Sequence, residues 1–276
     1  MNRLPEHSVE VSTASSAAAA ESVSESRAIT REEEAALSEL AQRIKAWGRE
    51  LGFGAVGISD IDLTDAEKGL ADWLDAGYHG EMDYMAKHGT KRARPAEHVA
   101  GTRRVITARM AYLPAETLAK TGDESVVTAD GQKNDWRAIE WSRLAKPSQA
   151  VVSIYARGRD YHKVMRNRLQ QLAERIEGEI GKFGYRAFTD SAPMLEVALA
   201  QKSGNGWRGK HSLLLDRDAG SLFFLGEIFV DVPLPVDPHP EQDGAHCGQC
   251  ARCAAPVRRA RSSRRIASMR GAASRI

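Results

Sequence analysis

The sequence has no long hydrophobic run. No stretch reaches the roughly 18 consecutive apolar residues of a membrane-spanning helix, so we expect no transmembrane helix and no membrane partner. A secretory signal is not recognisable either, because the alanines at 17–20 form too short an apolar run and Glu21 interrupts it. These absences favour a cytoplasmic protein.

Cysteine is scarce as well. The chain has three cysteines, Cys247, Cys250 and Cys253, all in one CxxCxxC array. Neighbouring cysteines at this spacing indicate metal ligands in a reducing compartment rather than a disulfide framework. One tight loop of this kind presents three thiolates to one 4Fe–4S cluster, as in bacterial ferredoxins. The spacing alone leaves a zinc knuckle open as the alternative.

Acidic residues are missing from the last part of the chain. After Cys253 there are seven arginines and no Asp or Glu, although the net charge of the whole chain is only +2. The ferredoxin pattern continues with a fourth cysteine and a proline, but Val257 stands where that cysteine belongs. Read one base earlier, the codons from Pro256 to Arg258 can spell Cys-Pro-Thr. We therefore interpret residues 257–276 as an out-of-frame tail that follows a single-nucleotide frameshift. The alternative is an arginine-rich segment that binds nucleic acid.

The rest of the chain mixes helix and strand signals. Residues 1–29 are rich in Ser, Ala and Glu, contain no aromatic residue, and are expected to form a disordered tail. Residues 116–150 are polar and irregular, which is typical of an insertion. Periodic apolar residues predict helices at 37–51, 70–74 and 164–180, and short apolar runs predict strands at 55–58, 105–108, 151–155, 213–215 and 222–230 and one that ends at 188–190. This mixture predicts an α+β fold with an α/β-like core.

Two aspartates follow predicted strands. Asp160, Tyr161 and His162 come after a glycine turn at the end of the 151–155 strand, a position where α/β folds place ligand sites. Asp190 stands in the same relation to the strand that ends at 188–190. For each aspartate, a helix cap is the alternative to a catalytic role.

A glycine-rich segment lies at 202–212. It holds three glycines, two lysines and Trp207. Glycine permits a close approach of the backbone to a bulky planar ligand. The spacings match neither the dinucleotide-binding nor the P-loop fingerprint. The segment 220–228 that follows is strand-like and is expected to lie in the core.

Five motifs occur in a fixed order between residues 157 and 253: RGxDYH, DSAPxLE, GxGWxGKHSLL, GSLFFLGE and CGxCxxC. As a set they resemble the epoxyqueuosine reductase family, and the resemblance runs from about residue 37 to Cys253. It implies a cobalamin-binding catalytic domain at 30–236. It also implies the start of a ferredoxin-like domain at 237–256, which carries two 4Fe–4S clusters in the intact family. Because this chain departs from the pattern after Cys253, we expect that domain to be incomplete and the chain as written to be inactive or severely impaired.

The resemblance implies the reduction of epoxyqueuosine to queuosine at the wobble position of tRNA. Electrons would pass from a donor of unknown identity through the clusters to cobalamin, in a protein that we expect to be a monomer. The resemblance makes Asp190 the proton donor. The other catalytic residues that it implies are Asp160, Tyr161 and His162, and the residues expected to approach cobalamin or substrate are Arg92, Ser153, Asp160, Asp190, Trp207, Lys210 and Leu214. Asn205 replaces an apolar residue that is usual in its loop.

Two other classes of function stay open. One is a corrinoid and iron–sulfur reductase of a small molecule, such as an organohalide. The other is a non-enzymatic RNA-binding remnant whose arginine tail contacts phosphates, and its binding would weaken steeply with salt. Accumulation of epoxyqueuosine in the tRNA of a deletion strain is expected under the first interpretation alone.

The nucleotide sequence around codons 253–258 tests the frameshift. Resequencing the gene is expected to show a one-base change there, with Cys-Pro-Thr encoded in the neighbouring frame. Verified, uninterrupted codons with no Cys-Pro-Thr in that frame would rule the frameshift out.

Overall fold

The computed structural model describes residues 29–113, 136–190, 192–238 and 246–253. The expected disordered tail lies outside the described residues except for Ile29, and the expected out-of-frame tail lies outside them entirely. The described ranges hold all the predicted site residues.

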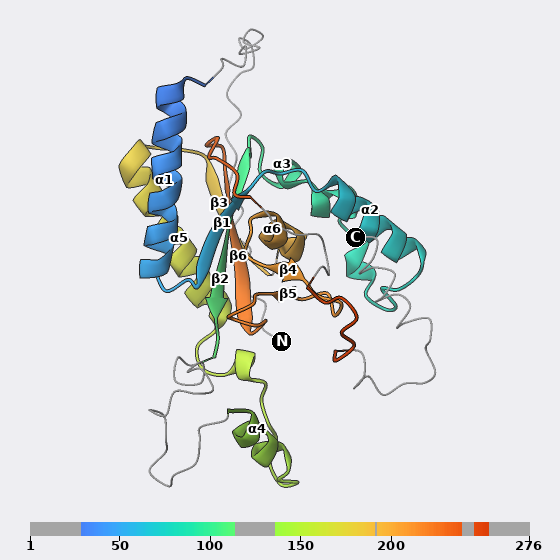
Figure 1. The fold of residues 1–276 in the computed structure, drawn as a ribbon. Coiled ribbons are helices and arrows are strands. Elements are labelled where there is room, and N and C mark those ends of the chain that lie inside the picture. Colours follow the sequence, from blue (N-terminus) through green and yellow to red (C-terminus); the bar gives the residue numbers. More distant parts are fainter. Residues whose placement is uncertain (1–28, 114–135, 191, 239–245, 254–276) are drawn as a thin grey trace, which may run out of the picture.

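A four-stranded sheet forms the centre of the fold (Figure 1). Its strands follow the order β1 (Ala55–Ser59), β2 (Arg104–Ala111), β6 (Phe223–Val230) and β3 (Tyr185–Thr189). Each neighbouring pair in this sheet is antiparallel. The predicted mixture of helices and sheet is therefore confirmed, but the arrangement is α+β, without the parallel pairs of an α/β core. The apolar pattern of a strand does not show in which direction its neighbour runs, so the sequence did not distinguish parallel from antiparallel pairing.

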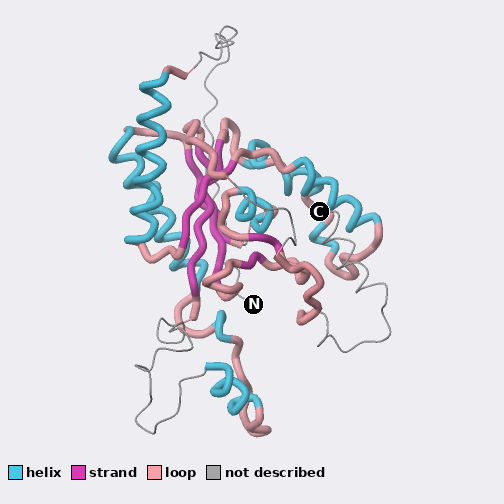
Figure 2. Tube along the Cα trace, viewed as in Figure 1, coloured by secondary structure: helices cyan, strands magenta, loops and turns pink. Residues whose placement is uncertain are grey.

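Helices cover both faces of this sheet, as Figure 2 shows. The long helices α1 (Arg31–Glu50) and α5 (Tyr161–Ile180) pack on one face, and the short helix α6 (Glu196–Lys202) packs on the other. Successive residues of a strand point to opposite faces. In β6, Ile228 and Val230 accordingly join the core beneath α1 and α5, while Phe229 joins a separate core beneath α6.

Local sequence explains where α1 begins and ends. Thr30 accepts a hydrogen bond from the backbone N–H of Glu33, and the Glu33 carboxylate accepts one from the backbone N–H of Thr30. This capping box satisfies two backbone donors that the first helical turn leaves free. Gly52 follows the helix with a φ of 83°, in the left-handed region that glycine adopts without a steric penalty.

Smaller elements lie around the sheet. They comprise the helices α2 (Thr64–Asp75), α3 (Pro95–His98) and α4 (Trp136–Leu144), the 3₁₀ helices Asp83–Met85, Gly89–Ala93 and Ile154–Ala156, and the two-stranded ribbon of β4 (Trp207–Arg208) and β5 (Leu214–Leu215). Helix α4 lies away from the sheet in Figure 1. It falls within the segment 116–150 that the sequence predicts to be irregular, so that expectation is wrong for the part of the segment that the structure describes.

The predicted strand at 151–155 is also wrong. This segment is an open stretch that leads into the 3₁₀ helix Ile154–Ala156, and Val152 and Tyr155 are 58% and 49% exposed. The carbonyl of Val152 accepts a hydrogen bond from the Arg157 guanidinium instead of from a neighbouring strand. A short apolar run forms a strand only where another strand is available to pair with it.

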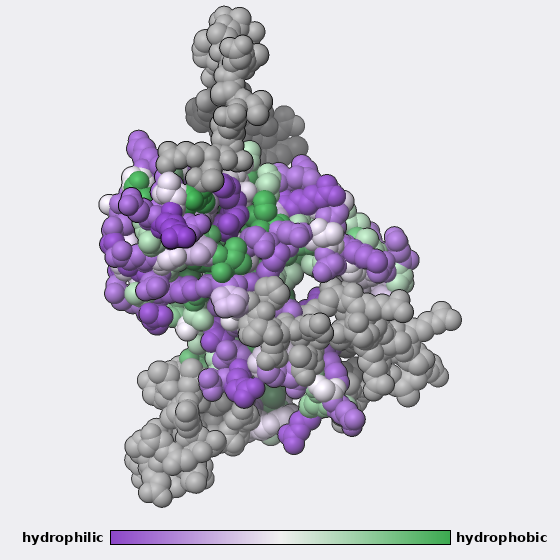
Figure 3. All heavy atoms as spheres, turned by 45° about the horizontal axis from the view of Figure 1, so that its top comes forward, coloured by the Kyte–Doolittle hydropathy of each residue, from purple (hydrophilic) through white to green (hydrophobic). Residues whose placement is uncertain are grey.

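The described residues on the face that Figure 3 shows are mostly hydrophilic, with a group of hydrophobic residues near the centre and a few others scattered around it. This distribution fits a fold whose apolar side chains lie between the sheet and its helices. Within the described ranges, no helix combines the length and the apolar character that crossing a membrane requires.

Two glycine-to-alanine substitutions test how closely the layers pack. A Cβ on Gly57 in β1 would lie 2.0 Å from the Ser203 carbonyl oxygen at the end of α6, whereas a Cβ on Gly178 in α5 would meet no atom within 4 Å. We expect Gly57→Ala to lower the free energy of unfolding by about 2 kcal/mol or more, because backbone cannot move aside as a side chain does. Gly178→Ala should raise it by about 0.5–1 kcal/mol. Denaturant unfolding measures both, and equal effects would contradict the close packing of β1 against α6.

Candidate active site

The end of β3 meets the start of α5 at Asp190. The Tyr161 hydroxyl donates a hydrogen bond to Asp190 Oδ2, and His162 Nε2 lies 2.7 Å from Asp190 Oδ1. Both carboxylate oxygens are therefore engaged by side chains from the first turn of α5. The Asp190 side chain nevertheless stays 43% exposed, so an incoming molecule can reach it. Asp190 is not a helix cap, because α6 begins at Glu196 and Leu195 occupies its cap position.

Asp160 completes the group from the other side of His162. It is the N-cap of α5, where its side chain accepts a hydrogen bond from the backbone N–H of His162, and its Oδ1 also lies 2.9 Å from His162 Nδ1. The imidazole thus stands between two carboxylates, and it donates to both only when both ring nitrogens carry protons. The hydrogen bond from His162 holds the pKa of Asp160 below its usual value. We call Asp160, Tyr161, His162 and Asp190 the Asp190 cluster.

Aromatic stacking fixes the Tyr161 ring. Its ring centroid lies 3.8 Å from that of Phe224 with the planes parallel within 1°, and 4.0 Å from that of His162. Burial and the hydrogen bond to Asp190 raise the pKa of Tyr161. Tyr161 therefore stays a neutral phenol that donates its proton to Asp190 as a hydrogen bond. The cluster combines a positioned carboxyl group, a histidine and a phenol, which is a set suited to moving protons.

Two further carboxyl groups have raised pKa values, that of Glu227, which is fully buried, and that of Glu196, which is partly buried. Glu227 in β6 is 0% exposed, and neither of its carboxyl oxygens has a hydrogen-bond partner among the described residues. Burial, followed by the charges of Glu196 and Asp190, raises the pKa of Glu227 well above its usual value. Burial and the charge of Asp190 likewise raise the pKa of Glu196 to about 8. Burial therefore favours the protonated form of both glutamates.

The sequence reasoning missed Glu227. The segment 220–228 is expected to lie in the core, and this holds for Gly226, Glu227 and Ile228, which are buried, whereas residues 221–225 are partly buried and Gly220 is exposed. An isolated acidic residue in an otherwise apolar strand is the signal that would have found Glu227, because charged residues are rarely buried without a partner.

Three other predicted site residues are not part of the Asp190 cluster, namely Arg92, Ser153 and Leu214. Arg92 is buried, and its guanidinium donates to the carbonyls of Met85 and Tyr84 at 2.9 and 2.7 Å. Ser153 precedes a 3₁₀ helix, and Leu214 is buried in β5. Their predicted role toward cobalamin or substrate stays a prediction.

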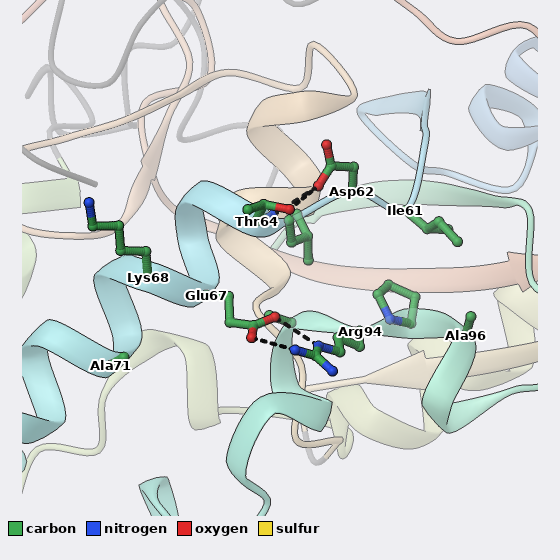
Figure 4. A pocket seen from close by; sticks show the side chains of 11 residues that line it. Ile61, Asp62, Thr64, Glu67, Lys68, Ala71, Arg94 and Ala96 are labelled. Atoms are coloured by element: carbon green, nitrogen blue, oxygen red, sulfur yellow. Dashed lines mark hydrogen bonds and ion pairs between the residues drawn. The ribbon is translucent and has the colours of Figure 1, made fainter.

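Two cavities of the described structure lie apart from the Asp190 cluster. One of about 480 Å³ lies beside α2, where Arg94 donates two hydrogen bonds to the Glu67 carboxylate (Figure 4). Another of about 590 Å³ lies between Glu50 at the end of α1 and Arg168 on α5. None of the predicted site residues lines either cavity. The cluster is an open site at the surface.

Lys210 and Trp207 contact the cysteine loop. The Lys210 ammonium donates to the carbonyls of Gly248 and Cys250, and the Trp207 ring centroid lies 4.4 Å from that of His246. The buried Nε1–H of Trp207 has no acceptor among the described residues. An unused buried donor could bind a polar group of a cofactor, and the cofactor role of Trp207 stays a prediction.

The three cysteines have the sequence spacing of iron–sulfur ligands, but their side chains are not grouped around one metal position. Cys250 and Cys253 are exposed and Cys247 is partly buried. Across the described ranges, no three Cys, His, Asp or Glu side chains are grouped so as to hold a metal ion. A 4Fe–4S cluster takes four ligands, and this chain offers three cysteines. The residues present therefore do not fit a complete cluster.

Asn205 and Gly206 serve the fold. The Asn205 side chain is buried and donates to the Thr107 carbonyl at 3.1 Å and to the Ser203 hydroxyl at 2.8 Å, which ties the loop after α6 to β2. Gly206 has a φ of 150°, and a Cβ there would lie 2.2 Å from the Leu215 carbonyl oxygen. The polar residue at 205 is thus satisfied internally, and Gly206 allows β5 to approach.

Comparisons with known proteins agree with one another. A family model described as epoxyqueuosine reductase QueG, DUF1730, matches residues 92–191. The chain is 70% identical over 230 residues to the epoxyqueuosine reductase of Burkholderia pseudomallei, covering 81% of this chain and 55% of the relative. It is 58% identical over 215 residues to that of Pseudomonas aeruginosa, covering 78% of this chain and 53% of the relative. The chain therefore spans about half the length of the curated relatives that it matches.

Solved structures show the same fold. A crystal structure of epoxyqueuosine reductase with an epoxyqueuosine-modified tRNA-Tyr stem loop matches with a TM-score of 0.58 at 16% identity. The match covers 78% of this chain and 50% of that one. At this identity the likeness concerns the fold alone.

Glu227→Gln tests the buried carboxyl group. In the unfolded chain Glu227 ionises above a pH of about 4.5, while in the folded chain it stays protonated, so folding becomes less favourable as the pH rises. Glutamine has no such cost. We expect Glu227→Gln to gain up to about 1.4 kcal/mol in stability per pH unit between pH 5 and 7, relative to the unsubstituted protein. Thermal unfolding at both values measures the gain, with the exposed Glu39→Gln on α1 as control. A gain that does not grow with pH would contradict the protonated state.

Proposed function

This chain belongs to the epoxyqueuosine reductase family, and on that premise we propose that it carries the catalytic part of an enzyme that reduces epoxyqueuosine to queuosine at the wobble position of tRNA. The observation that supports the proposal most directly is the Asp190 cluster, in which an accessible carboxyl group is held by a tyrosine and a histidine. The names of relatives at 58–70% identity supply the substrate. We divide the chain into this catalytic domain at 30–236 and the start of an iron–sulfur domain at 237–256.

The chemistry explains the need for an acid. Reduction of an epoxide to an alkene breaks two carbon–oxygen bonds, consumes two electrons and two protons, and releases the oxygen as water. An alkoxide or hydroxide is a poor leaving group, so a carboxylic acid that protonates the oxygen as it departs lowers the barrier. We assign this role to Asp190. Tyr161 and His162 orient the carboxyl group, and Asp160 orients His162.

The cofactors that we propose are those implied by the family. Cobalamin, when bound, would deliver electrons to the epoxide carbon, and Trp207, Ser153, Lys210 and Leu214 would hold it. Cys247, Cys250 and Cys253 would contribute three ligands to a 4Fe–4S cluster. We derive no step through that cluster, since a complete ligand set is not present in this chain. A low-potential electron donor and a monomeric state remain predictions.

We propose tRNA as the partner. One relative with the same fold has been crystallised with an epoxyqueuosine-modified tRNA stem loop. The modified base of a tRNA is part of a large polyanion, and an open site at the surface admits such a substrate more readily than an enclosed cavity. The exposed Asp190 cluster has this character.

Asp190→Asn tests the proton donor. Introduced at the matching position of an intact homologous gene, this substitution should lower the conversion of epoxyqueuosine to queuosine about 100-fold or more, because an amide cannot donate the proton. Mass spectrometry of nucleosides from cellular tRNA measures the two forms.

The matched control is Asp72→Asn, which changes an exposed aspartate on α2. It should leave queuosine at its normal level. A normal queuosine level in the Asp190→Asn strain would show that Asp190 is not needed for the reaction. An unchanged ratio of epoxyqueuosine to queuosine in a strain without the gene would refute the proposed function.

A further inference from the structure

Glu227 and Glu196 are two acids that the proposed reaction does not use. Glu227 is fully buried in the centre of β6, where its cross-strand neighbours are Thr107 on β2 and Phe188 on β3. It points to the same sheet face as Phe229, which α6 covers. Glu196 is the first residue of α6, and one of its carboxyl oxygens is buried without a hydrogen-bond partner among the described residues.

Among the described residues, no ion pair joins a basic side chain to Glu196 or Glu227. On the same sheet face, the Arg109 guanidinium lies 2.9 Å from the Asp216 carboxylate. Arg186 in β3 lies over the Phe188 ring, 5.1 Å from its centroid. Lys202, at the other end of α6, pairs with Asp60. The neutral form of the two glutamates is therefore the one that burial favours.

Ionisable groups of the active site lie next to the pair. Asp190 and Glu196 each act electrostatically on Glu227, and Asp190 also acts on Glu196. Tyr161, at the start of α5, donates a hydrogen bond to Asp190 Oδ2 and interacts electrostatically with Glu196. His162 lies beside the other carboxylate oxygen, Asp190 Oδ1. Asp190 is exposed at the end of β3, Glu227 is fully buried opposite Phe188 of the same strand, and Glu196 begins the helix that covers this face of the sheet.

Deoxygenation of an epoxide needs a second proton. The first proton leaves Asp190 as a carboxylate, which cannot donate again until it has been protonated. A bound tRNA would cover the exposed side of Asp190 and hinder the supply from solvent. A stored proton behind Asp190 removes that obstacle.

We propose that Glu196 and Glu227 form an internal proton reservoir that returns a proton to Asp190 between its two transfers. The inference rests on the proposed function. In the balanced reaction, Asp190 takes a proton from Glu196 and gives it to the epoxide oxygen, and a second proton that reaches Asp190 by the same route goes to the departing oxygen. Two electrons come from the low-potential donor, the products are the alkene and water, and Glu227 and solvent refill Glu196. Transfer toward Asp190 is driven by the departing oxygen, which is a far stronger base than a carboxylate.

The first measurement needs neither cofactor nor activity. Difference infrared spectroscopy of this chain between pH 6 and pH 9 should show a protonated carboxyl band at pH 7 that weakens as the pH rises through about 8, the region where Glu196 loses its proton. Glu196→Gln and Glu227→Gln should each remove part of this band, and the exposed control Glu39→Gln should leave it unchanged. A band that is absent, or that both variants retain, would overturn the reservoir even in a protein without activity.

The second measurement follows turnover. In the enzyme purified from its intact gene, Glu196→Gln should lower kcat about 10- to 100-fold with KM unchanged, because glutamine stores no proton. The fall of kcat as the pH rises through about 8 should disappear in this variant, and Glu196→Asp should restore part of kcat. A merely structural role would not produce this pH response or this rescue.

The outcomes separate the two proposals. Native kcat and a native pH profile in both glutamine variants would overturn the reservoir and leave the proposed function standing. An unsubstituted enzyme that does not convert epoxyqueuosine would refute the proposed function, and the infrared result would then decide the protonation of the pair alone.

Discussion

The geometry of the site depends on the contacts that Tyr161 and His162, at the start of α5, make with the Asp190 carboxylate. Tyr161 and His162, adjacent in the chain, each bind one oxygen of a carboxylate that lies 28 or 29 residues further on, at the end of β3. The capping aspartate Asp160 and the stacked ring of Phe224 fix the two donors in turn. One carboxyl group is thereby held in a single orientation while its surface stays open. That combination of rigidity and access is what an acid catalyst for a large substrate requires.

Behind this site, the two faces of the sheet have different character. The face beneath α1 and α5 is a conventional apolar core, whereas the face beneath α6 encloses carboxyl groups that are not ion-paired. Burying an acid without a partner destabilises the folded protein unless the acid keeps its proton. Glu227 at the centre of β6 therefore lowers the stability of the folded protein. The proposed role of Glu227, to supply protons to Asp190, would explain why a destabilising residue stands there.

Much of the site was predictable from short motifs. The four members of the Asp190 cluster come from two motifs, one after a glycine turn and one at the end of a strand, and the structure brings them together. The predicted strands and helices of the core are confirmed, since each had a clear apolar period. The prediction of a strand at 151–155 was wrong because its apolar residues have no neighbouring strand to pair with. Glu227 was not predicted as a site residue because it lies within an apolar run that is typical of the core. The contact of Lys210 with the cysteine loop could not be foreseen, because it joins positions about 40 residues apart.

The sequence by itself indicated the family, most of the core strands and helices, and the candidate site residues, since these depend on residue type, periodicity and short spacings. Only the tertiary structure decided the antiparallel direction of the strands, the protonated state of Glu196 and Glu227, and the engagement of Arg92 by backbone carbonyls. Those properties depend on burial and on neighbours that are distant in the chain. The free energy of a charge is set by the solvent and the groups around it, and the chain acquires these surroundings only when it folds.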